Sequence, residues 1–117
     1  MKTRLCHSDD VEEGDSLGFE IEAPGTHGDS GTAKRAVFAV KKNAAIYVYE
    51  NRCPHLGVEL EWQEHQFLDP DGALIQCATH GALFLIEDGS CISGPCMGAQ
   101  LTSVTSQIED GEVWVEL

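Results

Sequence analysis

Two short motifs in the middle of the chain each carry one cysteine and one histidine. The first is Cys53-Pro54-His55-Leu56-Gly57, and the second is Cys77-Ala78-Thr79-His80-Gly81. Thiolates and imidazoles bind zinc and iron, and two tight loops can present four of these ligands to a metal from several sides. Such a set fits a single tetrahedral zinc ion, or a [2Fe–2S] cluster with thiolates on one iron and imidazoles on the other.

The distribution of the four ligands over the two motifs favours the cluster. A zinc finger usually holds both cysteines in one knuckle and both histidines on a following helix. Here each motif supplies one cysteine and one histidine, so neighbouring loops can place the cysteines on one side and the histidines on the other. That arrangement suits a two-iron centre, with zinc as the alternative.

The two motifs and a third one, Gly94-Pro95-Cys96, resemble those of the Rieske [2Fe–2S] domain family. The resemblance extends to Asn51-Arg52 before the first cysteine and to residues 111–115 near the end of the chain. It implies that the segment around Pro95 covers the cluster. It also implies four ligands, with the two cysteines on the inner iron and the two histidines on the outer iron near solvent: Cys53, Cys77, His55 and His80.

Within this family the chain resembles the ferredoxin-like, low-potential branch. The respiratory-complex branch has an extra cysteine in each motif, joined as a disulfide, and Val58 and Thr79 stand at those positions here. That branch also has a serine and a tyrosine that donate hydrogen bonds to the cluster. Ala82 and Phe84 stand at these two positions.

The segments that flank these loops are predicted to be short strands. Alternating, β-branched or aromatic runs and turn residues predict a small antiparallel β-sandwich with two cluster-binding hairpin loops. The gap between the two motifs is longer than in the small Rieske ferredoxins that the chain resembles. We expect residues 61–70 to carry the extra length as a longer hairpin, with Asp69-Pro70-Asp71-Gly72 as its turn. Further hairpin turns are expected at Lys42-Asn43 and at Asp110-Gly111. The expected strands are residues 5–6, 17–22, 36–40, 45–50, 73–76, 83–86, 101–108 and 112–117.

The length of 117 residues predicts a single domain, residues 1–117, with a cluster-binding lobe at about 51–98. There is no run of about 18 apolar residues for a membrane helix, and residues 1–15 contain no apolar core of a signal peptide. Five cysteines, two of them assigned as ligands, do not suggest a disulfide framework. We therefore expect a cytoplasmic protein with no membrane partner.

Seven basic and twenty acidic residues give the chain a net charge of −13. This charge argues against binding to nucleic acid or anionic membranes. Eleven acids but no lysine or arginine follow Cys53. Acidity can serve solubility alone, but a negative field around the ligand motifs would also steer a basic docking surface of a redox partner toward them. All seven basic residues precede Cys53: Lys2, Arg4, Lys34, Arg35, Lys41, Lys42 and Arg52.

The remaining cysteines are expected to pack rather than to bind metal or form disulfides. Cys6 and His7 are adjacent but lie some forty-five residues from the first motif, so we expect a buried thiol and an exposed imidazole. Cys91 and Cys96 could pair, yet a cytosolic chain keeps its thiols reduced.

A cluster with four protein ligands has no open position for a substrate, so it gains or loses one electron. The resemblance implies a soluble ferredoxin, not an enzyme, that carries electrons from a flavin reductase to an oxygenase or another redox enzyme. Two alternatives are an accessory or assembly subunit of a larger redox complex and a zinc-stabilised binding module.

Overall fold

The computed structural model describes residues 2–24, 32–52, 60, 67–69, 71–77, 81–94 and 98–116. These residues contain nine strands and a short 3-10 helix, and none of them form a helix of the length and hydrophobicity that a membrane span needs. The elements are β1 (Lys2–His7), η1 (Ser8–Asp10), β2 (Ser16–Pro24), β3 (Thr32–Lys42), β4 (Ala45–Glu50), β5 (Leu74–Gln76), β6 (Leu83–Leu85), β7 (Cys91–Ser93), β8 (Thr105–Glu109) and β9 (Glu112–Glu116).

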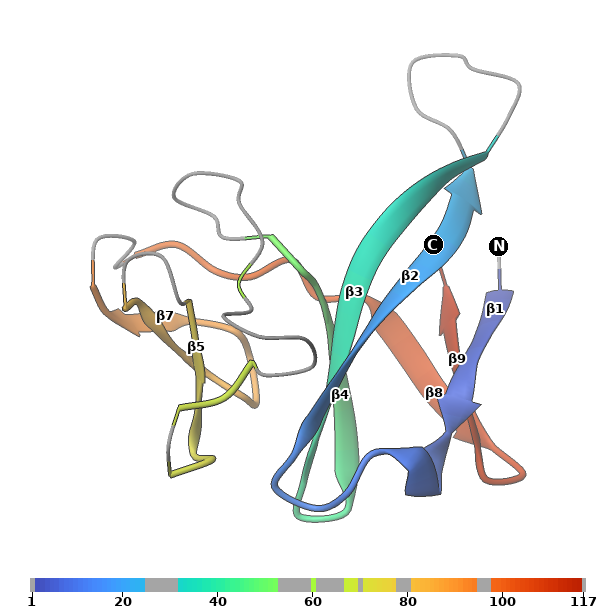
Figure 1. Cartoon of the computed structure of the whole chain (residues 1–117), viewed down its shortest axis with the longest axis horizontal. Coiled ribbons are helices and arrows are strands. Elements are labelled where there is room, and N and C mark those ends of the chain that lie inside the picture. The colour runs from blue at the N-terminus through green and yellow to red at the C-terminus, as the bar shows by residue number, and fades with distance from the viewer. Residues whose placement is uncertain are drawn as a thin grey trace.

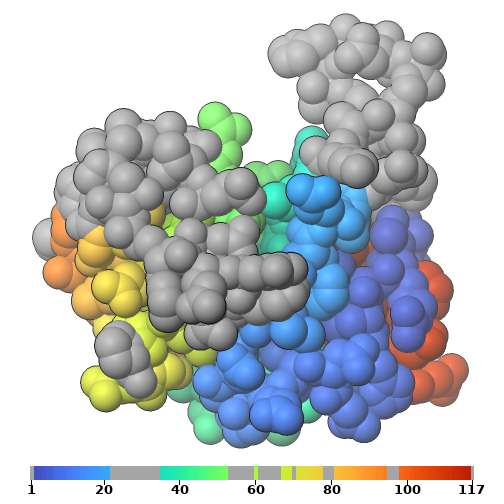
Figure 2. Space-filling view, viewed as in Figure 1, coloured from blue at the N-terminus to red at the C-terminus, as the bar shows by residue number. Residues whose placement is uncertain are grey.

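The strands form three antiparallel sheets of three strands each, which confirms the predicted all-β fold (Figure 1). Their strand orders are β1-β9-β8, β2-β3-β4 and β5-β6-β7. The sheet β2-β3-β4 lies between the other two, with the β5–β7 sheet on one side and the sheet of the two chain ends on the other (Figure 1). In the space-filling view, β5–β7 (yellow and orange) lie opposite the blue and red strands (Figure 2).

The central position of this sheet follows from an apolar run in β3. Residues 37–40 (Val-Phe-Ala-Val) are all completely buried, although their side chains alternate between the two faces of the sheet. Phe38 and Val40 belong to the core shared with the β5–β7 sheet, whereas Val37 and Ala39 belong to the core shared with β1 and β9. A strand without polar alternation is thus buried on both faces.

Most of the predicted strands and turns are confirmed. Asp110 and Gly111 have φ of 52° and 78°, the conformation of a two-residue turn that matches the twist of β8 and β9. The predicted turn after residue 68 is also present, because Gly72 donates a backbone hydrogen bond to the Asp69 carbonyl over 2.9 Å. Residues 61–66, which hold most of the expected longer hairpin, lie outside the described residues.

Several strand bounds differ from the sequence prediction: β8 begins at Thr105 rather than at residue 101, and β3 begins at Thr32 rather than at residue 36. Two further features differ. The turn between β3 and β4 is at Asn43 and Ala44, one residue later than expected, because both residues have positive φ, 53° and 66°. The strand β7 was not predicted, since three residues, Cys-Ile-Ser, are too few for a periodic pattern.

A carboxylate secures the β3–β4 turn. Glu13 accepts hydrogen bonds from the backbone N–H groups of Ala44 (2.8 Å) and Asn43 (2.7 Å). These two bonds hold the pKa of Glu13 below its ordinary value. The ionised carboxylate therefore stabilises the fold at neutral pH, and this contribution is lost as the pH falls through the lowered pKa.

We expect Ala44→Gly to stabilise the protein. A residue with a side chain pays about 1 kcal/mol or more in the left-handed region, and glycine avoids this cost. The saving exceeds the entropic penalty of glycine by about 0.5 kcal/mol. Urea unfolding monitored by tryptophan fluorescence measures the difference. The matched control is Ala45→Gly, at an exposed position in β4 outside the turn, which should destabilise by about 0.5–1 kcal/mol. A loss of stability in both variants would contradict the prediction.

Candidate metal centre

One of the four predicted ligands lies within the described residues. Cys77 follows β5 directly and is completely buried. The other three predicted ligands, Cys53, His55 and His80, lie outside the described residues, so the complete ligand set remains a prediction. The same holds for Val58, Thr79, Pro95 and Cys96.

The second ligand loop is closed at its base by two backbone hydrogen bonds. The N–H of Cys77 donates to the Ala82 carbonyl over 2.9 Å, and the N–H of Gly81 donates to the Cys77 carbonyl over 2.8 Å. Gly81 has φ of 67°, which a residue with a side chain rarely adopts. The loop between β5 and β6 is therefore tight, and Cys77 is held at its base.

The first ligand loop is closed by a side chain. The side-chain carbonyl of Asn51 accepts the backbone N–H of Leu60 over 2.8 Å, which joins the two ends of residues 52–59. Asn51 is buried, and its own N–H donates to the Ala36 carbonyl on β3 over 2.9 Å. The sequence resemblance included Asn51 but gave it no role. The sequence feature that could have marked Asn51 is a polar residue directly after the apolar strand β4.

The third motif begins in direct contact with the second ligand loop. Gly94 has φ of +99°, and a Cβ at this position would lie 2.8 Å from the Cα of Ala82. Real Cβ atoms do not approach a backbone so closely, so only glycine lets the two segments meet. This contact places the start of the predicted cover against the loop that carries Cys77.

Aromatic packing and a buried hydrogen bond join the segments beside β5 and β6 to the central sheet. Phe67 stacks on Phe38 with ring centroids 4.3 Å apart and an interplanar angle of 6°. Tyr49 on β4 donates its phenol hydrogen to the Ile86 carbonyl over 2.6 Å, and burial raises the pKa of Tyr49 to about 12, so the donor stays protonated. The strands on either side of the second loop, β5 and β6, therefore stand in a packed core.

The arrangement fits a metal centre with a buried thiolate ligand. An unpaired thiolate is costly in an apolar core, whereas coordination to iron compensates its charge. Cys77 shares its core with Ala82 and Phe84, which are also completely buried. Neither of these two residues has a hydroxyl group, in agreement with the ferredoxin-like branch.

The cysteines outside the motifs pack as predicted where the structure describes them. Cys6 on β1 is buried, and its burial raises the pKa of the thiol. Cys91 is also buried, and its thiol donates to the Ser93 carbonyl over 3.3 Å. No disulfide joins Cys6, Cys77 and Cys91 to one another. His7 is half-exposed, and its Nδ1 accepts the backbone N–H of Asp9, which caps the 3-10 helix.

Comparisons with known proteins agree with the motifs. The family model of the Rieske [2Fe-2S] domain matches residues 1–108. A ferredoxin of carbazole 1,9a-dioxygenase from Nocardioides aromaticivorans IC177 is 17% identical, with a TM-score of 0.71 over 98% of this chain and 96% of that one. The ferredoxin of Sphingomonas yanoikuyae B1 is 25% identical, with a TM-score of 0.65 over 100% and 99%.

A further similar chain comes from the complex of reduced oxygenase and oxidized ferredoxin in carbazole 1,9a-dioxygenase. It is 21% identical, with a TM-score of 0.67, and the match covers 97% of this chain and 91% of that chain. A sequence search of curated proteins finds no match.

Proposed function

Because the chain belongs to the Rieske [2Fe–2S] domain family, which confirms the family predicted from its motifs, we propose that it is a soluble one-electron carrier. The observation that carries the proposal is the family match over residues 1–108, joined by ferredoxin structures that match over nearly their whole length. A bound cluster supplies a centre that takes up or releases one electron. The role is electron transfer, not catalysis.

We propose that the chain forms one domain over residues 1–117 and binds the cluster with Cys53, Cys77, His55 and His80. The burial of Cys77 at the base of a closed loop supports its place on the inner iron. The hydrogen bonds at Asn51 and Ala82 close the two loops, and the approach of Gly94 to Ala82 brings the start of the third motif against the second loop.

The proposed acceptor is a terminal oxygenase, and the proposed donor is a flavin reductase in the cytoplasm. Solved structures similar to this chain include complexes of a ferredoxin with the oxygenase of carbazole 1,9a-dioxygenase. The net charge of −13 favours partners with basic docking surfaces. The sequence does not indicate which compound the oxygenase would act on.

Anaerobic titration of the purified protein with dithionite tests this function. We expect a red-brown protein with iron and sulfide in equal amounts, one electron taken up per two irons, and full recovery of the absorbance on reoxidation. A colourless protein that contains zinc, or a cluster that is destroyed by one cycle of reduction, would contradict the proposal.

The reduction potential should lie in the lower part of the Rieske range. Rieske centres span about −150 to +300 mV, and hydroxyl donors raise the potential because they stabilise the added negative charge. Ala82 and Phe84 provide no hydroxyl. Protein-film voltammetry should therefore give a midpoint below about +100 mV, with little dependence on pH near neutrality. A higher midpoint, or a steep fall with pH near 7, would contradict the branch assignment.

Ala82→Ser should raise this midpoint. A new hydrogen bond to the cluster that is stronger by about 1.4 kcal/mol in the reduced state corresponds to about +60 mV for a one-electron couple. Ala73→Ser is the matched control, because Ala73 is exposed in the turn before β5 and should leave the midpoint unchanged.

A further inference from the structure

Five of the six basic side chains that the structure describes make a contact within the molecule. Four of them form ion pairs with glutamates, and a fifth donates to a backbone carbonyl. These contacts are Lys2–Glu109 (2.7 Å), Arg4–Glu112 (2.8 Å), Arg35–Glu50 (3.2 Å), Lys42–Glu87 (2.8 Å) and Lys41 with the Ser8 carbonyl (3.1 Å). Among the basic side chains that the structure describes, Arg52 alone has no ion pair or hydrogen bond.

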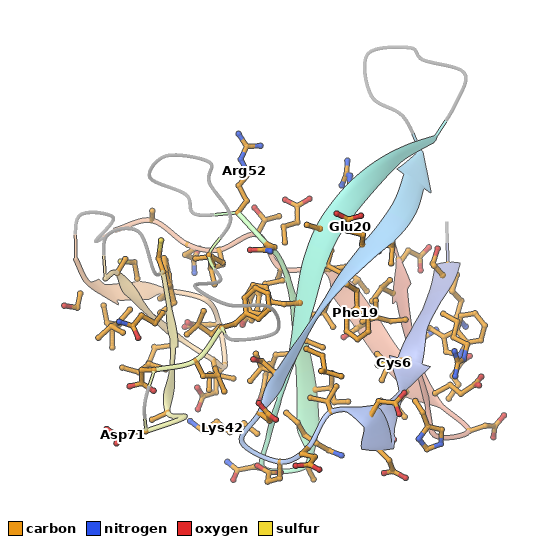
Figure 3. All side chains as sticks on the ribbon, in the orientation of Figure 1. Cys6, Phe19, Glu20, Lys42, Arg52 and Asp71 are labelled. Carbon is orange, nitrogen blue, oxygen red and sulfur yellow. The ribbon has the colours of Figure 1, made fainter. Side chains whose placement is uncertain are left out.

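Arg52 stands directly before the first predicted ligand. It follows β4, its backbone N–H donates to the Glu50 carbonyl over 2.9 Å, and Cys53 is the next residue, one Cα–Cα step of about 3.8 Å away. The side chain is exposed and projects away from the sheets into solvent (Figure 3). The backbone of Arg52 is thus fixed, while its guanidinium group is free to meet another molecule.

The composition of the chain after Arg52 makes this cation distinctive. No lysine or arginine follows Arg52 in the chain, whereas eleven acidic residues do. Glu50, two residues before Arg52, is already paired with Arg35 on the neighbouring strand. Arg52 therefore keeps its complete fork of donors, which matches the two oxygens of a carboxylate.

We infer that Arg52 is a docking residue of the electron-transfer face and pairs with a carboxylate on the redox partner. This inference rests on the proposed function. The net charge of −13 attracts a basic surface from a distance, and Arg52 then repels such a surface locally at the cluster edge. The partner that fits is net basic but carries a carboxylate beside the site that exchanges the electron. Long-range attraction sets the encounter, and the single cation sets the orientation.

A chemical modification tests whether Arg52 is available. The chain has three arginines, and Arg4 and Arg35 are both paired with glutamates. Phenylglyoxal followed by peptide mass spectrometry should modify Arg52 several-fold faster than the other two. The result does not depend on whether the cluster is loaded. Equal modification of all three arginines would overturn the inference at its first step.

Small electron acceptors of opposite charge test the field at the cluster edge. The reduced protein is oxidised by the trianion ferricyanide or by the trication tris(phenanthroline)cobalt(III), and one electron leaves the cluster for each acceptor reduced. For Arg52→Glu we expect ferricyanide to react about fivefold more slowly and the cobalt complex about fivefold faster at 0.1 M salt, because two units of charge change close to the exit site.

The matched control is Arg4→Glu, with the same charge change at an exposed arginine on β1, in the sheet on the far side of the central sheet (Figure 1). It should change either rate less than about twofold. Equal effects of the two substitutions would overturn the inference. So would a rate change of the same sign with both acceptors, since that indicates a shifted potential.

The failure of the inference is distinguishable from the failure of the proposed function. Iron and sulfide content and the spectrum of the reduced unmodified protein are measured first. Absence of a cluster there contradicts the function, whereas a reversible cluster with indifferent Arg52 variants contradicts only the docking role.

Discussion

Replacing His80 with alanine is expected to abolish the visible absorption and the electron paramagnetic resonance signal of the dithionite-reduced protein. In the proposed site each iron has two protein ligands, and the small side chain leaves one coordination position of the outer iron unfilled. Cys77→Ser should have the same effect on the inner iron, because Cys77 is fully buried and no other thiol of its closed loop can replace it. His55→Ala should match His80→Ala.

The controls are residues of the same types outside the two motifs. Cys91→Ser should keep the cluster, since the Cys91 thiol donates to the Ser93 carbonyl in the core, and Cys96→Ser should keep it as well. His7→Ala should also keep it, because His7 caps the 3-10 helix after β1. A retained signal in His80→Ala, or a lost signal in Cys96→Ser, would contradict the ligand assignment.

The second large effect is expected for Gly94→Ala. The new methyl carbon would stand 2.8 Å from the Cα and 3.1 Å from the Cβ of Ala82, so the third motif must move away from the second ligand loop. We expect a loss of about 3 kcal/mol in unfolding free energy, from backbone strain and the contact together. The opened site should also lose its iron faster to a chelator than that of the unmodified protein.

Gly98→Ala separates these two causes. Gly98 also has positive φ, +93°, but a Cβ there would meet no atom within 4 Å. Its substitution should cost only the strain, about 1–2 kcal/mol, and leave the rate of iron release unchanged. Thermal unfolding and the decay of the visible absorbance in a chelator measure both quantities. Similar iron release from the two variants would show that the contact with Ala82 does not protect the cluster.

The elements that depend on neighbouring residues were predictable from the sequence. The alternating run in β2 and the apolar run in β3 both predict strands, because successive side chains of a strand point to opposite faces. The Asp110-Gly111 turn followed from its residues, since both have positive φ. The two cysteine–histidine motifs likewise predicted the family, because the ligand types and their spacing within each loop are local properties.

The arrangement of these elements was decided by contacts between residues far apart in the chain. β1 pairs with β9, and the two faces of the central sheet are covered by different distant segments of the chain, neither of which a local pattern specifies. The apolar run in β3 could have been buried equally well in another layer order.

The contacts that hold the ligand loops in place also join residues that are separated in the chain. The hydrogen bond from Leu60 to Asn51 spans nine residues, and Gly94, directly after β7, meets Ala82, directly before β6. The isolation of Arg52 depends on where the fold places the fifteen acidic side chains that the structure describes, of the twenty in the chain. The sequence therefore predicts which residues bind the cluster. Only the packing of distant segments determined what holds the loops closed and which charge stays free, because such contacts depend on three-dimensional distance rather than on position in the chain.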